Sequence, residues 1–372
     1  MSFKIIKKSK KSSARAGEIR TKHGIIKTPC FMPIATAGSV KSLDSVEIKK
    51  IGAQIILGNT YHLYLRPGDE LIKKLDGLHK FMNWNGPILT DSGGYQVFSL
   101  AKIRKISEKG AEFKSHIDGS LHMLTPEKSI EIQQNLGSDI IMVLDECAPY
   151  PATKEYINKS LELTSRWAER CKIYFDKKNK TLGKNKSLLF GIVQGGTYKD
   201  LREESARQLI EIGFDGYAIG GVSVGEPSEK MFKAVDWTVP FLPEEKPRYL
   251  MGVGKPEEIV GAVARGIDMF DCVIPTRNAR HGTLYKFKSK SEKLKVHNTN
   301  KNFYELLHIT NEKFKNDKKP IDKNCGCFTC QNYSRAYLRH LFGAKELLAL
   351  RLASIHNIYF YLELMKRIRS SV

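Results

Sequence analysis

Leu188-Leu-Phe-Gly-Ile-Val193 is an apolar run that ends at Gln194-Gly-Gly, and it is followed by an amphipathic segment, Asp200–Ile212, and a second run, Gly216-Tyr-Ala-Ile219. Short apolar runs without alternation are typical of strands that are buried on both faces. A helix-length segment between two such runs predicts a β-α-β unit with parallel strands. This order decides the fold class.

The same alternation extends over most of the chain. Eight apolar runs with amphipathic segments between many of them predict an α/β protein, and eight parallel strands can close into a (β/α)8 TIM barrel. A doubly wound open sheet is the alternative. The stretches around 100–125 and after 280 are expected to be additions to the barrel. The expected strands are Ile25–Ile34, Ala53–Leu57, Pro87–Thr90, Asp139–Leu144, Leu188–Val193, Gly216–Ile219, Arg248–Met251 and Met269–Ile274.

Composition and charge limit the function. The 372 residues are 41% hydrophobic and 27% charged, and no apolar stretch is long enough to cross a bilayer or to act as a signal peptide, so we expect a cytoplasmic protein without a membrane partner. The net charge is +21, with a local +7 over residues 1–22 and a local +6 over residues 286–323. Such clusters favour a nucleic-acid partner, although solvated tails are the alternative.

Three cysteines lie close together in Cys325-Gly-Cys327-Phe-Thr-Cys330, and a helical segment with His356 follows. Three sulfur ligands and one nitrogen ligand are typical of a structural zinc site, because four protein ligands leave no open position. His340 is an alternative fourth ligand on spacing alone. We expect a barrel over residues 1–280, and a zinc-binding subdomain with closing C-terminal helices over residues 281–372.

Polar residues or glycines follow six of the predicted strands, where a parallel barrel places its working residues. A single Asp at such a junction is more often a helix cap, but six junctions on one rim favour a pocket. Cleavage of a glycosidic bond uses a carboxylate nucleophile and a second carboxyl group for proton transfer, which suits Asp271 and Asp91. Asp145 and Gln194 can read the edge of a purine, and Tyr95 and Met251 can stack on its faces.

Several motifs together resemble those of the tRNA-guanine transglycosylases. They are Asp91-Ser-Gly-Gly-Tyr-Gln-Val, Asp145-Glu-Cys, Gly191-Ile-Val-Gln-Gly-Gly, Gly220-Gly-Val-Ser-Val-Gly-Glu, Met251-Gly-Val-Gly, Phe270-Asp-Cys-Val-Ile-Pro-Thr-Arg and Cys-x-Cys-x-x-Cys. The resemblance covers nearly the whole chain in the right order. It implies a barrel with an inserted zinc subdomain, which exchanges the wobble guanine of tRNA for a 7-deazaguanine.

The resemblance also implies roles for individual residues. Asp271 would be the nucleophile that forms a covalent intermediate with the ribose, and Asp91 would be the general acid and base. The family pattern selects His356 as the fourth zinc ligand. The base would be bound by Ser92, Gly93, Gly94, Tyr95, Asp145, Gln194, Gly221, Val222 and Met251. The RNA would be bound by Gly252, Val253, Gly254, Lys255, Pro256, Glu257, Glu258, Thr276, Arg277, Asn278, Ala279 and Arg280.

The subtype indicated is bacterial. Asp145-Glu-Cys147 resembles the bacterial pattern, and a valine at Val224 leaves less room than glycine for the cyclopentenediol group of queuine. Val222 stands where the bacterial family usually has leucine. The implied substrates are 7-aminomethyl-7-deazaguanine and the anticodon loop of tRNAs with GUN anticodons, in queuosine biosynthesis, and the implied assembly is a homodimer.

Two other functions remain open from the residues alone. A glycoside hydrolase would share the paired carboxylates, but it would not need the charge clusters or Gln194. A non-catalytic RNA-binding protein would explain the charge and the metal site, but not six polar strand ends.

Overall fold

Nine short strands form one parallel sheet in the computed structural model, which describes residues 2–100, 104–180, 186–289, 294 and 303–372. Neighbouring strands pair in the order β4-β15-β14-β13-β12-β11-β7-β6-β5. Nearly every side chain of these strands is buried, which explains their continuous apolar sequences. The strands are β4 (Cys30–Met32), β5 (Ile34–Ala35), β6 (Ile56–Gly58), β7 (Ile88–Thr90), β11 (Ile140–Met142), β12 (Leu188–Val193), β13 (Gly216–Ile219), β14 (Arg248–Leu250) and β15 (Met269–Asp271).

The two edges of this sheet belong to one stretch of chain. β4 pairs with β15, β5 pairs with β6, and only Pro33 separates β4 from β5. Proline has no N–H to donate and interrupts a ladder. Counted as one interrupted strand, β4 and β5 complete a closed barrel of eight strands, which confirms the (β/α)8 prediction over the open sheet.

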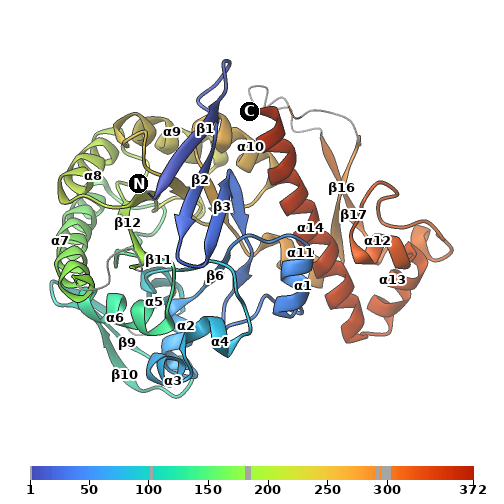
Figure 1. Cartoon of the computed structure of the whole chain (residues 1–372), viewed down its shortest axis with the longest axis horizontal. Helices are drawn as coiled ribbons and strands as arrows, with labels where there is room; N and C mark the ends of the chain where they lie inside the picture. Colours follow the sequence, from blue (N-terminus) through green and yellow to red (C-terminus); the bar gives the residue numbers. More distant parts are fainter. Residues whose placement is uncertain (1, 101–103, 181–185, 290–293, 295–302) are drawn as a thin grey trace.

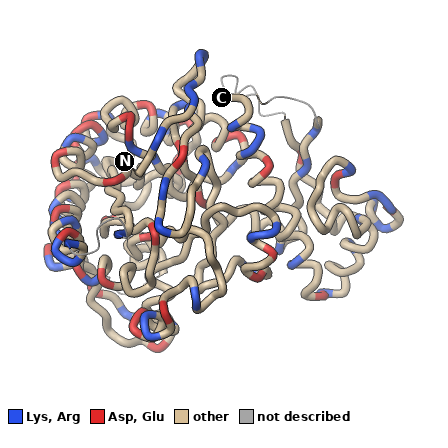
Figure 2. The backbone as a smooth tube through the Cα atoms, viewed as in Figure 1, with Lys and Arg blue, Asp and Glu red and all other residues tan. Residues whose placement is uncertain are grey.

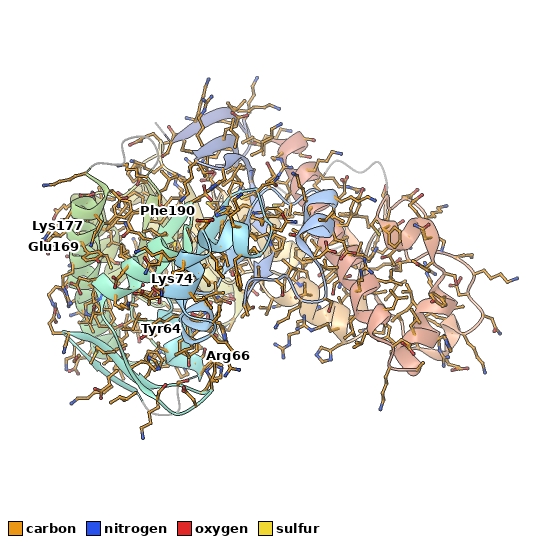
Figure 3. The ribbon with its side chains drawn as sticks, turned by 60° about the horizontal axis from the view of Figure 1, so that its bottom comes forward. Tyr64, Arg66, Lys74, Glu169, Lys177 and Phe190 are labelled. Carbon is orange, nitrogen blue, oxygen red and sulfur yellow. The ribbon has the colours of Figure 1, made fainter. Side chains whose placement is uncertain are left out.

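Helices surround the barrel (Figure 1). The amphipathic segments Thr125–Leu136, Lys154–Phe175, Asp200–Ile212 and Pro256–Gly266 predict four helices. These are found as α6 (Pro126–Leu136), α7 (Lys154–Asn179), α8 (Lys199–Ile212) and α10 (Pro256–Ala264), and α9 (Ser228–Thr238) joins them. Each shows one face to the barrel: Glu169 and Lys177 on α7 are exposed at the outer edge, whereas Phe190 of β12 is buried inside (Figure 3). Shorter helices complete the first half, namely α1 (Ser45–Lys50), α2 (Thr60–Leu65), α3 (Asp69–Lys74), α4 (Gly77–Phe81) and α5 (Gly94–Leu100).

The first predicted strand, Ile25–Ile34, is wrong as a single element. Its first half is β3 (Gly24–Thr28), which pairs antiparallel with β2 (Arg15–Thr21), and β2 pairs with β1 (Phe3–Lys8). Pro29 separates β3 from β4, so one apolar run serves two sheets. β3 alternates exposed and buried side chains, whereas β4 is buried at every position, so a single strand drawn over both missed the change at Pro29.

The β1–β3 sheet covers the end of the barrel where the strands begin (Figure 1). Arg15 of β2 forms an ion pair with Asp268, the residue before β15, and His23 contacts Asp139, the residue before β11. The basic cluster over residues 1–22 therefore lies at the opposite end of the barrel from the carboxyl ends of the strands. Lys and Arg predominate along strands β1 and β2, whereas α7 carries both signs of charge (Figure 2).

The two expected additions are present. β8 (Arg104–Ser107), β9 (Gly110–Lys114) and β10 (Leu121–Leu124) form a small antiparallel sheet. After α11 (Ile274–Arg280) come β16 (Thr283–Phe287), β17 (Tyr304–His308), α12 (Phe328–Asn332), α13 (Arg335–Gly343) and α14 (Leu347–Ser371). α14 packs back on the barrel through Tyr361, whose ring lies 4.9 Å from that of Phe31. No helix in the described part of the chain is long and apolar enough to span a membrane.

Candidate active site

A cavity of about 430 Å³ opens at the carboxyl ends of the barrel strands. Asp91 follows β7 and Asp271 ends β15, and although these strands are not neighbours in the sheet, both residues line this one cavity. A base-sized ligand fits a space of this volume. Among the sequence-predicted residues, the lining also includes Ser92, Tyr95, Asp145, Gly221, Val222, Met251, Gly252 and Arg277.

Asp271 is the last residue of β15 and is 8% exposed. Its Oδ1 atom accepts hydrogen bonds from the Tyr249 hydroxyl (2.5 Å) and from the Gly252 N–H (2.8 Å). Burial raises the pKa of Asp271, and these two hydrogen bonds limit the rise. Both donors act on Oδ1, so Oδ2 is the carboxylate oxygen available to a ligand.

Asp91 follows β7 directly and is also 8% exposed. Its carboxyl accepts hydrogen bonds from the Asn59 amide, the Thr60 N–H (2.8 Å) and the Gln96 amide (2.9 Å). Burial raises the pKa of Asp91 to about 6, and the charge of Asp271 contributes to the rise. A carboxyl group with this pKa can give and take a proton near neutral pH.

Asp145 stands beyond β11 on the same rim. It accepts hydrogen bonds from the Ser92 hydroxyl (2.8 Å) and from the Gln194 side-chain amide (2.8 Å), and burial raises its pKa to about 6. Gln194 lies behind Asp145 and borders a small neighbouring hollow instead of the main cavity. Three buried carboxyl groups thus share one rim, and the hydrogen-bond donors to each are neutral.

The other predicted base-binding residues take two kinds of position. Tyr95 on α5 is 47% exposed and Met251 is half-buried, and both line the cavity. Gly93 and Gly94 form the turn into α5, where a side chain at Gly94 would meet the Asp145 carbonyl oxygen at 2.4 Å. Only glycine allows α5 to begin so close to Asp145.

The two predicted RNA-binding segments are partly buried. In the first, Gly252 and Lys255 are exposed and Glu257 is half-buried, whereas Val253, Gly254, Pro256 and Glu258 are buried. In the second, Arg277 is exposed at the cavity, Asn278 and Arg280 are half-buried, and Thr276 and Ala279 are buried. A buried Arg280 nitrogen, Nη1, has no hydrogen-bond partner among the described residues. The cations of these two segments are Lys255, Arg277 and Arg280, and of these Arg277 lines the cavity.

Several residues of the site escaped the sequence prediction. Asn59 hydrogen-bonds Asp91, Tyr249 hydrogen-bonds Asp271, and Arg202 donates to four backbone carbonyls beneath the cavity. Asn59 follows β6, so the rule that identified the other junctions would have found it. Arg202 has a weaker signal, an arginine on the apolar face of an amphipathic helix.

A second cluster lies between α12 and α14. The Sγ atoms of Cys325, Cys327 and Cys330 are 3.8, 3.5 and 3.3 Å from Nδ1 of His356. Zinc–ligand bonds of about 2.3 Å to sulfur and about 2.0 Å to nitrogen put tetrahedral ligands roughly 3.6 Å apart. His356 Nε2 donates to the Tyr285 carbonyl oxygen (2.6 Å), which leaves Nδ1 free for the metal. The group is arranged to bind a metal ion, and the exposed His340 lies outside it.

Known proteins resemble the whole chain. The family model described as queuine tRNA-ribosyltransferase matches residues 9–372. The queuine tRNA-ribosyltransferase of Thermoanaerobacter pseudethanolicus is 56% identical over 372 residues, which are 100% of this chain and 93% of the relative. The one from Caldanaerobacter subterraneus subsp. tengcongensis is 55% identical over 370 residues, again 100% and 93%. The chain therefore belongs to the queuine tRNA-ribosyltransferase family and is a tRNA-guanine transglycosylase.

Proposed function

We propose that this enzyme exchanges the wobble guanine at position 34 of tRNAs with GUN anticodons for 7-aminomethyl-7-deazaguanine, a step of queuosine biosynthesis. The observation that supports this most is the shared cavity of Asp91 and Asp271, with neutral hydrogen-bond donors to both. A carboxylate of this kind is not neutralised by a cation and can attack an electrophilic carbon.

In the first half-reaction, the free Oδ2 of Asp271 attacks C1′ of the target nucleotide. A C1′–O bond forms while the C1′–N9 bond breaks, and Asp91 donates the proton that guanine needs as it leaves. The tRNA is then held as a covalent aspartyl-ribose ester. In the second half-reaction, Asp91 takes a proton from the incoming base, whose nitrogen attacks C1′ and displaces Asp271. Both carboxyl groups return to their starting states.

The base edge is held by Asp145, whose carboxyl Gln194 orients from behind through a hydrogen bond of 2.8 Å. The base carbonyl oxygen is held by the amide of Gly221, and the faces of the base by Tyr95 and Met251. Val224 lines the same cavity, and its side chain favours the small aminomethyl substituent over the larger ring of queuine. The anticodon loop lies across Arg277, Arg280 and Lys255, where phosphates meet these cations. The target base must swing out of the loop to reach the cavity.

We also propose that the Cys3His group holds one structural zinc ion, that the chain divides into a barrel (1–280) and a zinc-binding subdomain (281–372), and that the enzyme is a cytoplasmic homodimer. Four protein ligands leave zinc no open position for water, so the ion would tie α12 to α14. Metal analysis of the purified enzyme should find about one zinc per chain, and Cys327→Ala should release it. Unchanged zinc content in this variant would show that the ligand assignment is wrong.

Incubation with unmodified tRNA and radiolabelled guanine tests the proposed reaction. Label should enter tRNA whose anticodon is GUN, and unlabelled 7-aminomethyl-7-deazaguanine should compete with it. A matched tRNA with another base at position 34 should take up no label. Binding of tRNA without uptake of label would support a non-catalytic RNA-binding protein, and release of free base without uptake would support a hydrolase.

A further inference from the structure

Arg202 is a fully buried arginine that has no place in the reaction described above. It lies on α8 with 0% exposure, and its guanidinium forms no ion pair with a carboxylate in the described part of the chain. A buried charge usually needs a partner of opposite sign. Here burial lowers the pKa of Arg202 to about 10, and backbone carbonyls take the place of a counter-ion.

The guanidinium joins the ends of two neighbouring strands. Nε and Nη1 donate to Gly196 (2.8 Å) and Val193 (3.1 Å) at the end of β12. Nη1 and Nη2 donate to Gly220 (2.8 Å) and Gly221 (3.3 Å) at the end of β13. Four carbonyl oxygens therefore point at Arg202, and two of them belong to successive peptide groups of the cavity wall.

The orientation of these two peptide groups has a consequence for the cavity. In a planar trans peptide, the C=O and the N–H point in opposite directions. Because the carbonyls of Gly220 and Gly221 point at Arg202, the N–H groups of Gly221 and Val222 point away from it. Both residues line the cavity, and no hydrogen bond of either N–H is found within the described residues. Gly221 has φ of +61°, in the left-handed region, and successive backbone N–H groups that face one side can bind an anion or a partly negative oxygen.

We propose that Arg202 is a positioning residue that turns the paired N–H groups of Gly221 and Val222 into the cavity, where they bind the carbonyl oxygen of the purine. The inference rests on the proposed function, since it assumes a guanine-type base in this cavity. It adds Val222 as a second backbone donor to that oxygen and gives Arg202 a role in base specificity without contact to the base.

The test compares two bases in two variants. Guanine has the carbonyl oxygen and 2-aminopurine lacks it, so their dissociation constants separate the effect on this oxygen from general damage. For Arg202→Lys we expect guanine to bind about tenfold more weakly, and 2-aminopurine to bind as in the wild type. Arg248→Lys is the matched control: it removes a buried guanidinium that also donates to a backbone carbonyl, at the other end of the barrel. It should change neither constant.

Equal weakening of both bases in Arg202→Lys, or no weakening of either, overturns the proposal. If the variant does not fold, a crystal structure of the wild-type enzyme with guanine decides: the carbonyl oxygen should lie within hydrogen-bond distance of both N atoms, and contact with neither refutes the inference. These outcomes are separate from the proposed function, which fails only if the wild-type enzyme incorporates no label into tRNA.

Discussion

Both ends of the barrel bury aspartates: the cavity end, where the strands finish, and the closed end, which the β1–β3 sheet covers. The two ends differ in the groups that lie beside each carboxylate. At the cavity end, all hydrogen bonds that Asp91, Asp145 and Asp271 receive from described residues come from neutral groups. At the closed end, Asp268 pairs with the Arg15 guanidinium through two bonds of 3.0 and 2.6 Å, and Asp139 is hydrogen-bonded by the ring of His23 at 2.9 Å. A carboxylate paired with a cation holds the fold, whereas one without a cation is free to react.

The buried carboxyl groups of the cavity, which have no cationic partner, lower the stability of the fold. Burial raises the pKa values of Asp91 and Asp145 to about 6, so their charged forms are disfavoured in the folded state. The histidines beside Asp139, together with the Ile88 N–H, lower its pKa despite burial. The stabilising contacts at the closed end thus offset the loss of stability from the cavity carboxylates, which lack cationic partners and serve the reaction.

The largest expected effect belongs to Asp271→Asn. Loss of the nucleophile should lower the rate of guanine exchange by at least about 1000-fold and abolish any tRNA adduct that survives denaturation. The free energy of unfolding should not fall, because the variant removes a buried charge that has no cationic partner. Labelled-guanine uptake, denaturing gel electrophoresis and thermal unfolding measure the three quantities. An adduct in the variant would exclude Asp271 as the nucleophile.

Asp268→Asn lies three residues earlier on the same chain segment, and we expect the opposite result from it: a loss of stability without a loss of exchange. It leaves the Arg15 guanidinium buried with only the carbonyls of Glu244 and Lys246 and a neutral amide. Removing one partner of a buried ion pair destabilises by about 3–5 kcal/mol. Chemical denaturation should show this loss, while exchange measured at low temperature on the folded fraction stays close to wild type. A large loss of guanine exchange in Asp268→Asn with an unchanged free energy of unfolding would show that the closed end also takes part in the reaction.

The dependence of stability on pH should have opposite signs for Asp91 at the cavity and for Asp139 at the closed end. Folding raises the pKa of Asp91, so the folded state takes up its proton first, and the wild type gains stability relative to Asp91→Asn as pH falls from about 7 to about 4. The gain is at most about 3 kcal/mol. Folding lowers the pKa of Asp139, so the wild type loses stability relative to Asp139→Asn as pH falls below about 4.

Denaturation curves at a series of pH values measure both differences. The rate of exchange should fall below about pH 6 as the cavity carboxyls take up protons, although the fold is stable there. Parallel curves for Asp91→Asn and the wild type would show that Asp91 titrates normally.

Much of this architecture could be predicted from the sequence, because the strands are continuous apolar runs and the reactive residues follow them directly. Asp91, Asp145 and Asp271 stand out for that reason. The closed end could not be predicted in the same way, since Arg15 and Asp268 are 253 positions apart and no local pattern connects them. Pro29 and Pro33 mark the breaks in Ile25–Ile34, but no local pattern shows that the residues before Pro29 join a different sheet from those after it. The position of Arg202 on the apolar face of a helix is a weak signal, and its role was missed because its partners are backbone carbonyls, which the sequence does not identify.

The smallest expected effect concerns His23, which lies at the edge of the closed end with 35% of its side chain exposed. His23→Ala removes its ring from Asp139, but the carboxylate keeps the N–H of residue 23, the Ile88 N–H (2.9 Å) and His79 (3.2 Å). With three donors left and one side of the ring in water, we expect a loss of about 1 kcal/mol in the free energy of unfolding and no change in guanine exchange.

Burial, with contributions from His79 and Lys22, lowers the pKa of His23 below its ordinary value, so its neutral form is the one that stabilises the fold. The difference between the wild type and His23→Ala should therefore shrink as pH falls through about 6.5, in contrast to the behaviour of a histidine that is held charged by its carboxylate. Lys27→Ala, an exposed position on the neighbouring strand β3, provides the control, and denaturation at pH 8 and pH 5 measures the difference.

If the difference in the free energy of unfolding instead grows at pH 5, His23 and Asp139 form a charged pair, as Arg15 and Asp268 do. A loss of exchange in His23→Ala would show that the two ends communicate, because no atom of His23 lines the cavity.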